Sequence, residues 1–501
     1  MAEVDSILDR RRAGVLLHIT SLPSPSGTGD LGDDAHHFVD FLAEAGLSVW
    51  QTLPIGPTHG DRSPYQCMSA HAGNPEFISL EWLVHRGWIT PADMSATPDA
   101  RAPLRQSALS KAFIGLVREP EDGFNRRQLR SFERANEYWL DDYALFICLR
   151  EKFGNTSWQT WPDEYRDRKP DALMLVKSEL SHVISKIKFE QFVFFSQWNQ
   201  LRRYANQKGV LLFGDMPIFV ALDSADVWAN KESFDLDEQG NARVVAGVPP
   251  DYFSATGQRW GNPHYNWQHM EETGFQWWMD RLKTQLNLYD LIRIDHFRGF
   301  EAYWEISANE PTAINGRWVK APGEALLRRI YECFGSRSLP LVAENLGVIT
   351  EEVEALRAMF EIPGMLILQF AFDGGLDNPY LPANHRENEV VYTGTHDNDT
   401  TVGWYAGLSD SGKRKVLETL GEDRQTDAMP WSLIASALNS KARLAMIPMQ
   451  DFLELGADAR MNTPGTLEDR NWSWQFAWSQ LPDSLAHSIL TRVREAERTH
   501  R

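Results

Sequence analysis

The chain has 501 residues and a formal net charge of −19, with 43% hydrophobic and 24% charged residues. These are the proportions of a globular protein, so a disordered or fibrous chain is excluded. An acidic total without a long basic run argues against nucleic acid or an anionic membrane as partner, because both attract clustered Lys and Arg. The length fits two or three domains of about 100–200 residues, or one α/β barrel with insertions.

The cysteines and the apolar runs bear on the compartment. Cys67, Cys148 and Cys333 lack the spacing of a metal or redox site, which is typical of a reducing cytosol. No apolar run approaches the 18 or so residues that a membrane-spanning helix needs, and the first residues do not resemble a secretory signal. The sequence therefore predicts a cytoplasmic protein without a membrane partner.

Eight short apolar segments in chain order are predicted as strands. They lie at 13–19, 48–55, 209–217, 291–297, 339–346, 364–372, 390–397 and 444–450. They do not alternate between apolar and polar residues, which is typical of parallel strands buried on both faces. Several end in ionisable residues, as expected for a barrel whose site lies at the carboxyl ends of its strands. We predict an α/β fold, a (β/α)8 TIM barrel, with a doubly wound open sheet as the alternative.

The gaps between these strands are uneven, and two of them are too long for a simple βα unit. A helical pattern fills most of the first gap, so residues 75–170 are predicted as an inserted helical subdomain. Residues 218–290 contain a stretch dense in Gly, Pro and aromatic residues, and a long segment of this kind inside a compact domain is usually functional. We predict a single catalytic barrel over 1–501, with 218–290 as a loop-rich subdomain bordering the active site.

A nucleotide-binding reading fails on context. Residues 27–32 fit the spacing G-x-G-x-x-G, but a proline-bearing segment separates them from the strand before. A dinucleotide fingerprint follows its strand directly and needs an acidic residue about 20 positions later. The sequence has no such acid there, so we predict no nucleotide cofactor.

Four acids stand at the ends of predicted strands: Asp215, Asp295, Glu344 and Asp397. Each alone reads equally well as a helix cap or an ion pair, but their convergence at one face of a barrel favours a working site. Acids paired across a cleft are what cleavage of a glycosidic bond requires, one as proton donor and one as nucleophile. The 19 tryptophans suit the same task, since aromatic faces pack against the C–H face of a sugar ring.

Several segments resemble known sequence blocks. RIDHFRGF (293–300), VAENLG (342–347), GTHDNDT (394–400) and GDMPIFV (214–220) are similar to the catalytic blocks of the α-amylase clan. Other segments, among them GVLLHITSLPSPSGTGDLG, SPYQCMSAHAGNP, VPPDYFSATGQRWGNPHYNW and QDFLELGADARMNTPGT with NWSWQF, narrow the resemblance to one family. The chain resembles the 4-α-glucanotransferases of the amylomaltase, or disproportionating-enzyme, family, glycoside hydrolase family 77.

The resemblance implies roles for three acids. Asp295 corresponds to the nucleophile, Glu344 to the general acid and base, and Asp397 to an acid that binds sugar hydroxyls. Arg293 is then expected to keep Asp295 ionised, because a neighbouring cation lowers a carboxyl pKa. Asn345 stands where Asp is expected, and His71 where an aromatic residue is expected.

Further residues are implied as sugar contacts. They are Tyr65, Asp215, Asp251, Tyr252, Phe253, Ser254, Gln258, Trp260, Arg293, His296, His396 and Asn462. The segment 248–260, which carries several of them, is expected to exclude water so that an acceptor sugar reacts instead.

The predicted activity is retaining transfer of α-1,4-glucan segments from a donor glucan or maltooligosaccharide to the 4-hydroxyl of an acceptor glucan or glucose. An α-amylase-like hydrolase is the alternative within the clan, and a non-catalytic glucan-binding protein is the alternative outside it. Side chains supply every catalytic role, so no cofactor and no metal is expected. The oligomeric state stays open.

Overall fold

The computed structural model describes residues 8–24, 27–94, 101–250, 254–335, 339–421 and 428–499, with the side chains of 101–103 excepted. Eight parallel strands form one sheet in the order β10-β11-β12-β1-β2-β3-β6-β9. They are β1 (Arg12–Leu16), β2 (Val49–Gln51), β3 (Leu211–Pro217), β6 (Leu291–Asp295), β9 (Leu341–Ala343), β10 (Gly364–Ile367), β11 (Glu389–Tyr392) and β12 (Leu444–Pro448). Each overlaps one predicted segment, so the predicted barrel is confirmed.

The barrel closes between β9 and β10, the two ends of this order. The N–H of Ala343 donates to the carbonyl of Pro363 at 2.8 Å. The N–H of Met365 donates to Oδ1 of Asn345, also at 2.8 Å. At this seam between β9 and β10, the side chain of Asn345 replaces one of the backbone hydrogen bonds that would pair the two strands. Asn345 therefore has a structural role.

Successive strand residues alternate between two apolar clusters. Phe213, Leu291 and Met446 belong to a small cluster formed by residues of seven barrel strands, which fills the barrel interior. Their neighbours, such as Leu212 and Ile292, belong to the large cluster formed with the surrounding helices. Because side chains of a strand point alternately to its two faces and both faces are buried here, the strands read as continuous apolar runs.

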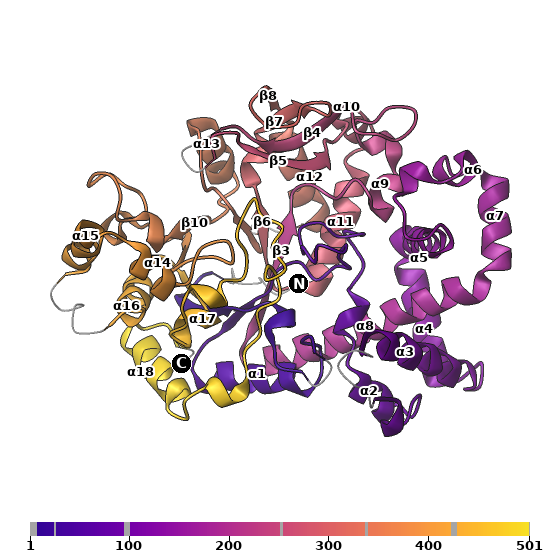
Figure 1. Cartoon of the computed structure of the whole chain (residues 1–501), viewed down its shortest axis with the longest axis horizontal. Helices are drawn as coiled ribbons and strands as arrows, with labels where there is room; N and C mark the ends of the chain where they lie inside the picture. Colours follow the sequence, from indigo (N-terminus) through magenta and orange to yellow (C-terminus); the bar gives the residue numbers. More distant parts are fainter. Residues whose placement is uncertain are drawn as a thin grey trace.

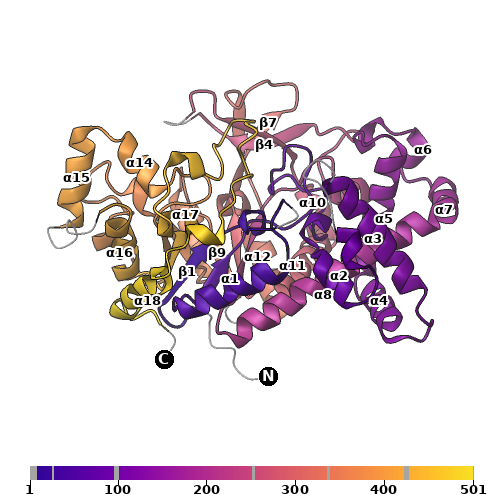
Figure 2. The same cartoon turned by 60° about the horizontal axis from the view of Figure 1, so that its bottom comes forward.

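Helices fill the chain between β2 and β3 and form one side of the molecule (Figures 1 and 2). They are α2 (Leu80–His85), α3 (Arg101–Val117), α4 (Phe124–Ala135), α5 (Glu137–Lys152), α6 (Asp163–Arg166), α7 (Pro170–Glu179) and α8 (Ser181–Gln207). Helix α8 contacts both α5 of this group and α1 (Asp33–Glu44) and β3 of the barrel. The helical character of 75–170 is therefore present, while the boundaries of the subdomain stay a prediction.

A second, four-stranded antiparallel sheet has the order β5-β4-β7-β8. Strands β4 (Val244–Val248) and β5 (Gln258–Pro263) follow β3, whereas β7 (Ala302–Ser307) and β8 (Gly316–Lys320) follow β6. The loop-rich reading of 218–290 is incomplete, since that range also holds α9 (Ala225–Ala229), α10 (Trp267–Glu272) and α11 (Gln276–Leu288). The sheet joins two loops that leave the carboxyl ends of neighbouring barrel strands.

The rest of the chain completes the helical layer. It contains α12 (Gly323–Phe334), α13 (Glu351–Met359), α14 (Thr401–Gly407), α15 (Asp410–Leu420), α16 (Trp431–Asn439), α17 (Met449–Phe452) and α18 (Leu485–Glu495). The predicted strand 364–372 ends at Ile367 and continues as a 3-10 helix, Leu368–Phe370. In the part of the chain that the structure describes, no helix has the length and apolar character to cross a bilayer.

Candidate active site

One arginine joins two of the predicted acids at the ends of neighbouring strands. Asp215 on β3 and Arg293 on β6 are register partners. Arg293 donates from Nη1 to Oδ2 of Asp215 at 2.6 Å, and its Nη2 lies 2.8 Å from Oδ1 of Asp295. Asp215 and Arg293 are buried, whereas 29% of the Asp295 side chain is exposed. The arginine therefore fixes the more open carboxylate against a buried one.

Aromatic side chains form one wall of this site. The hydroxyl of Tyr65 donates to Oδ2 of Asp215 at 2.7 Å. The Tyr65 ring stacks on His396, with ring centroids 5.2 Å apart, and Trp472 lies 5.9 Å from each of these rings. Residues predicted separately as sugar contacts thus meet in one cluster, to which the structure adds Trp472.

Asp397 is held by the residues around it. Nδ2 of Asn462 donates to its Oδ1 at 2.6 Å, and Nε2 of His396 lies 3.3 Å from the same oxygen. Arg460 donates to the backbone carbonyl of Asp397 at 2.5 Å. Burial by itself raises the pKa of Asp397, but His396 and Asn462 outweigh it and lower the pKa to about 2. Asp397 is therefore an ionised acceptor of hydrogen bonds.

A buried acid outside the prediction holds the loop that carries His396 and Asp397. Asp451 in α17 accepts from the hydroxyl of Thr393 at 2.6 Å, before this loop begins. It also accepts from the N–H and the hydroxyl of Thr401, at 2.8 and 2.7 Å, where the loop ends. One carboxylate thus fixes both ends of the loop.

Glu344 follows β9 directly, and backbone N–H groups hold its carboxylate. His296 donates to Oε2 and Leu346 to Oε1, each at 2.8 Å. His296 presents its N–H from a left-handed conformation with φ of 55°, which is uncommon for a residue other than glycine and is concentrated at functional sites. Burial lowers the pKa of His296 to about 3, so its ring is neutral.

Asp295 and Glu344 influence each other's protonation. Burial raises the pKa of both, to about 7 for Asp295, and the charge of Asp215 adds to this rise. Arg293 acts in the predicted direction by lowering both values. The net shift of Asp295 is nevertheless upward, opposite to the expectation, because burial, with the charges of Asp215 and Glu344, outweighs the effect of Arg293. Two carboxyls with raised pKa values at one site can retain one proton between them near neutral pH.

The loop expected to exclude water is described only in part. Asp251, Tyr252 and Phe253 lie outside the described residues. The hydroxyl of Ser254 donates to the carbonyl of Gly257 at 2.8 Å, and Oε1 of Gln258 accepts from Trp260 at 3.1 Å. The Trp260 ring meets His296 edge to face at 4.9 Å. Among Ser254, Gln258 and Trp260, the structure thus places Trp260 against a residue that holds Glu344.

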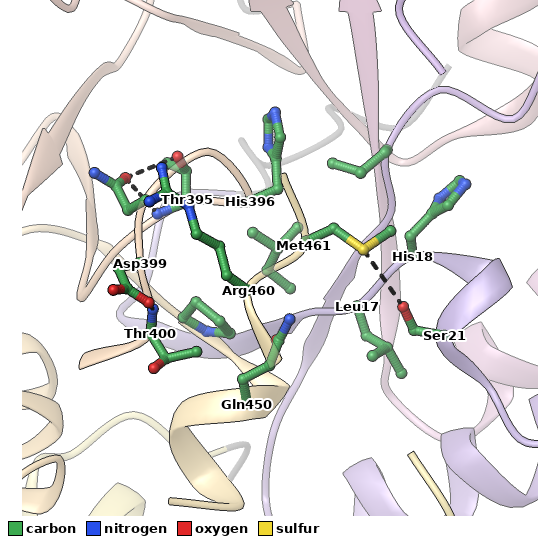
Figure 3. A pocket seen from close by; sticks show the side chains of 14 residues that line it. Leu17, His18, Ser21, Thr395, His396, Asp399, Thr400, Gln450, Arg460 and Met461 are labelled. Carbon is green, nitrogen blue, oxygen red and sulfur yellow. Dashed lines mark hydrogen bonds between the residues drawn. The ribbon is translucent and has the colours of Figure 1, made fainter. Parts of the chain in front are cut away.

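A small pocket of about 30 Å³ lies beside this site, at the ends of β1 and β12 (Figure 3). His18, His396, Arg460 and Met461 are among its lining residues. Burial and the nearby His396 lower the pKa of His18 to about 3. His18, Arg460 and Met461 lie in segments that carry the family resemblance, but nothing in the sequence assigns them to this pocket.

Metal ligation has no candidate in the described part of the chain, since no group of three or more His, Cys, Asp or Glu side chains is placed to hold an ion there. The three cysteines are free thiols, and Cys148 is buried.

Comparisons with known proteins agree with the geometry of the fold. Residues 17–480 match a family model described as 4-alpha-glucanotransferase. The 4-alpha-glucanotransferase of Thermus thermophilus is 48% identical, with 98% of this chain and 99% of that protein covered. The chloroplastic/amyloplastic 4-alpha-glucanotransferase of Solanum tuberosum is 43% identical, over 95% of this chain and 84% of that protein. The structure of an amylomaltase from Streptococcus agalactiae in complex with acarbose superposes with a TM-score of 0.92 at 36% identity, over 98% and 100% of the two chains.

Proposed function

The chain belongs to the 4-α-glucanotransferases of glycoside hydrolase family 77 and transfers α-1,4-glucan segments, and we propose that Asp295, Glu344 and Asp397 carry out this transfer. The family favours transfer over the hydrolase alternative. The observation that carries the assignment is the pairing of Asp295 and Glu344 at the ends of adjacent strands, both with raised pKa values. Such a pair supplies one ionised and one protonated carboxyl.

In the first half-reaction a carboxylate oxygen of Asp295 attacks the anomeric carbon of the donor. The bond from that carbon to the 4-oxygen of the next glucose breaks, and Glu344 donates its proton to this oxygen. The ion pair with Arg293 favours Asp295 as the ionised member of the pair. The product is a covalent glucosyl-enzyme and a shortened glucan with a free 4-hydroxyl.

In the second half-reaction the 4-hydroxyl of an acceptor glucan attacks the same carbon and gives its proton to Glu344. The bond to Asp295 breaks, and the carboxylate leaves with its electron pair. Two inversions give net retention of the anomeric configuration. The enzyme returns to its starting protonation state, so the cycle needs no external acid, base or cofactor.

The remaining residues bind sugar in this proposal. Asp397, held by Asn462 and His396, accepts hydrogen bonds from sugar hydroxyls, while Tyr65 offers an aromatic face. The neutral ring of His296 has a buried Nε2 without a hydrogen-bond partner in the described part of the chain, which makes it available to a hydroxyl group. The segment 248–260, including Asp251, Tyr252, Phe253, Ser254, Gln258 and Trp260, is proposed to contact the acceptor and exclude water. Because glucans are uncharged, the acidic net charge of the protein is not needed to attract the substrate. We propose that the protein works in the cytoplasm.

The products of maltotriose test the proposal. Transfer yields glucose and longer oligosaccharides with little rise in total reducing ends, whereas hydrolysis raises the reducing ends by one for each bond lost. D295N and E344Q are expected to lose about 10⁴-fold or more and about 10²–10⁴-fold in activity, respectively. Both are expected to bind acarbose, the compound in the solved relative's complex. Full turnover by D295N would refute Asp295 as the nucleophile.

A further inference from the structure

Arg298 is a buried cation beside the site that the proposed mechanism does not use. It lies three residues after Asp295 in the 3-10 helix η7 (Phe297–Phe300) and is 6% exposed. No carboxylate among the described residues lies within 4.0 Å of its guanidinium. Burial lowers the pKa of Arg298, and only the more distant Glu301 opposes this. Burying a charge without an ion pair destabilises the folded state, so a functional role would explain why Arg298 lies here.

The guanidinium of Arg298 connects two segments of the chain. Its Nη1 donates to the carbonyl of Val348, which lies four residues after Glu344. Its central carbon lies 3.8 Å from the ring centroid of Trp318 in β8, which places the indole over the cation. The second sheet therefore holds Arg298 against the segment that follows the general acid.

This connection matters because the carboxylate of Glu344 depends on both segments. The N–H of His296 comes from the turn that leads into η7, and the N–H of Leu346 comes from the segment after β9. Within the described part of the chain, Val348 has no hydrogen bond except the one from Arg298, and the residue is 59% exposed. Arg298 is thus the side-chain link between the two groups that aim the acid.

We propose that Arg298 is a positioning residue for Glu344, held in place by Trp318, and that it fixes the segment 346–348 relative to the turn after Asp295. The proposal rests on the assigned role of Glu344. Without Arg298 the Leu346 N–H is no longer held toward Oε1, while the His296 N–H remains. Losing a hydrogen bond to the ionised form favours the protonated form, so the pKa of Glu344 rises.

This role can be tested by comparing a substrate that needs a general acid with one that does not. With maltotriose, R298M is expected to lose about 100-fold in kcat/KM, the typical cost of a catalytic group misplaced by about 1 Å. The alkaline limb of its pH profile is expected to move to higher pH. With α-maltosyl fluoride as donor and azide as acceptor, R298M is expected to stay near wild type. Fluoride leaves with the electron pair of its bond to carbon without a proton, and azide attacks without losing one.

Conservative variants and references separate the possible outcomes. R298K retains a donor for the Val348 carbonyl and is expected to recover much of the activity, and W318A is expected to fall between R298K and R298M. R317M removes a charge from an exposed position next to Trp318 and is expected to change neither reaction. Equal losses on both donors, or no loss on maltotriose, would overturn the positioning role. If R298M does not fold, R298K and W318A carry the same comparison. An E344Q enzyme with full maltotriose activity would instead refute the proposed function.

Discussion

The hydroxyl of Tyr65 donates a 2.7 Å hydrogen bond to Oδ2 of Asp215, across 150 residues of sequence. The same oxygen accepts from Arg293 at 2.6 Å. Oδ1 of Asp215 is buried and has no hydrogen-bond partner among the described residues. A single buried oxygen therefore orients both the stacking ring and the cation that faces Asp295, and we propose that Asp215 acts on the reaction through these two partners.

Replacing Tyr65 by phenylalanine removes this hydrogen bond and keeps the ring against His396. We expect kcat/KM for maltotriose to fall about 10- to 100-fold, because a hydrogen bond to a charged group contributes about 1.5–3 kcal/mol. The matched control is Y204F, which removes a 2.7 Å tyrosine hydrogen bond to Asp40 away from the site. Equal kinetics for Y65F and Y204F would show that the bond to Asp215 is not used.

Asp215 is also expected to influence the pH range of activity. Its negative charge raises the pKa of Asp295 and of Glu344, so D215N is expected to lower both values. In the proposed mechanism, activity needs Asp295 ionised and Glu344 protonated. Both limbs of the kcat/KM profile are therefore expected to move to lower pH, together with a loss in rate. The Y65F profile, with all charges kept, is the reference. A D215N profile that moves to higher pH contradicts the charge argument.

Asp451 is expected to matter first for stability. D451A leaves the Thr393 hydroxyl and both Thr401 donors without their buried acceptor. We expect the free energy of unfolding to fall by about 3 kcal/mol, since each buried unsatisfied group costs about 1–3 kcal/mol and the loop relaxes in part. Urea unfolding measures this change. D410A, at an exposed position in α15, is the control and is expected to stay within about 0.5 kcal/mol of wild type.

The barrel and its acids were predictable for a physical reason. A strand buried on both faces must be apolar, so an ionisable residue at its end, such as Asp295 or Glu344, stands out in the sequence. All eight strands overlap their predicted segments. The roles of these acids came from the family resemblance. The spacing of the acids does not tell which one is the nucleophile and which one is the general acid.

The contacts that hold the acids were not predictable from local pattern. Strand β8 is half exposed and forms only by pairing with β7, so its residues show no strong strand signal. Asp451 and Arg298 read as ordinary charged residues until the fold brings Thr393 and Val348 to them. The upward pKa shift of Asp295 comes first from its burial and then from the charges of Asp215 and Glu344, which only the folded structure brings near it.

A substitution of Asn345 tests whether the contact between β9 and β10 affects the pKa of the neighbouring Glu344. Its Oδ1 accepts from Met365, and its Nδ2 donates to Glu354 at 2.7 Å. N345D keeps the acceptor but places a second carboxylate against Glu354. We expect a loss of about 1–2 kcal/mol in unfolding free energy at pH 7. We also expect a higher pKa for Glu344, seen as an alkaline limb moved to higher pH.

The control for this seam variant is N241D. Nδ2 of Asn241 also donates to a carboxylate, Asp237, at 3.0 Å, but on the exposed surface, where screening makes the repulsion small. If N345D and N241D lose equal stability and N345D leaves the pH profile unchanged, Asn345 acts neither on the seam nor on the acid.

Trp260 tests the exclusion of water. Its ring packs edge to face against His296 at 4.9 Å, and its N–H donates to Gln258. The indole therefore connects residues 258–260 of the loop to the site. Transfer requires the acceptor to outcompete water, which is far more concentrated, so W260A is expected to raise the fraction of hydrolysis as well as to slow transfer. Free glucose and total reducing ends from maltotriose, measured together, give that fraction. W82A, which removes a partly buried indole from α2 in the helical insertion, is the control and is expected to leave the fraction unchanged. A W260A enzyme in which both reactions slow in proportion would mean that Trp260 binds sugar and does not exclude water.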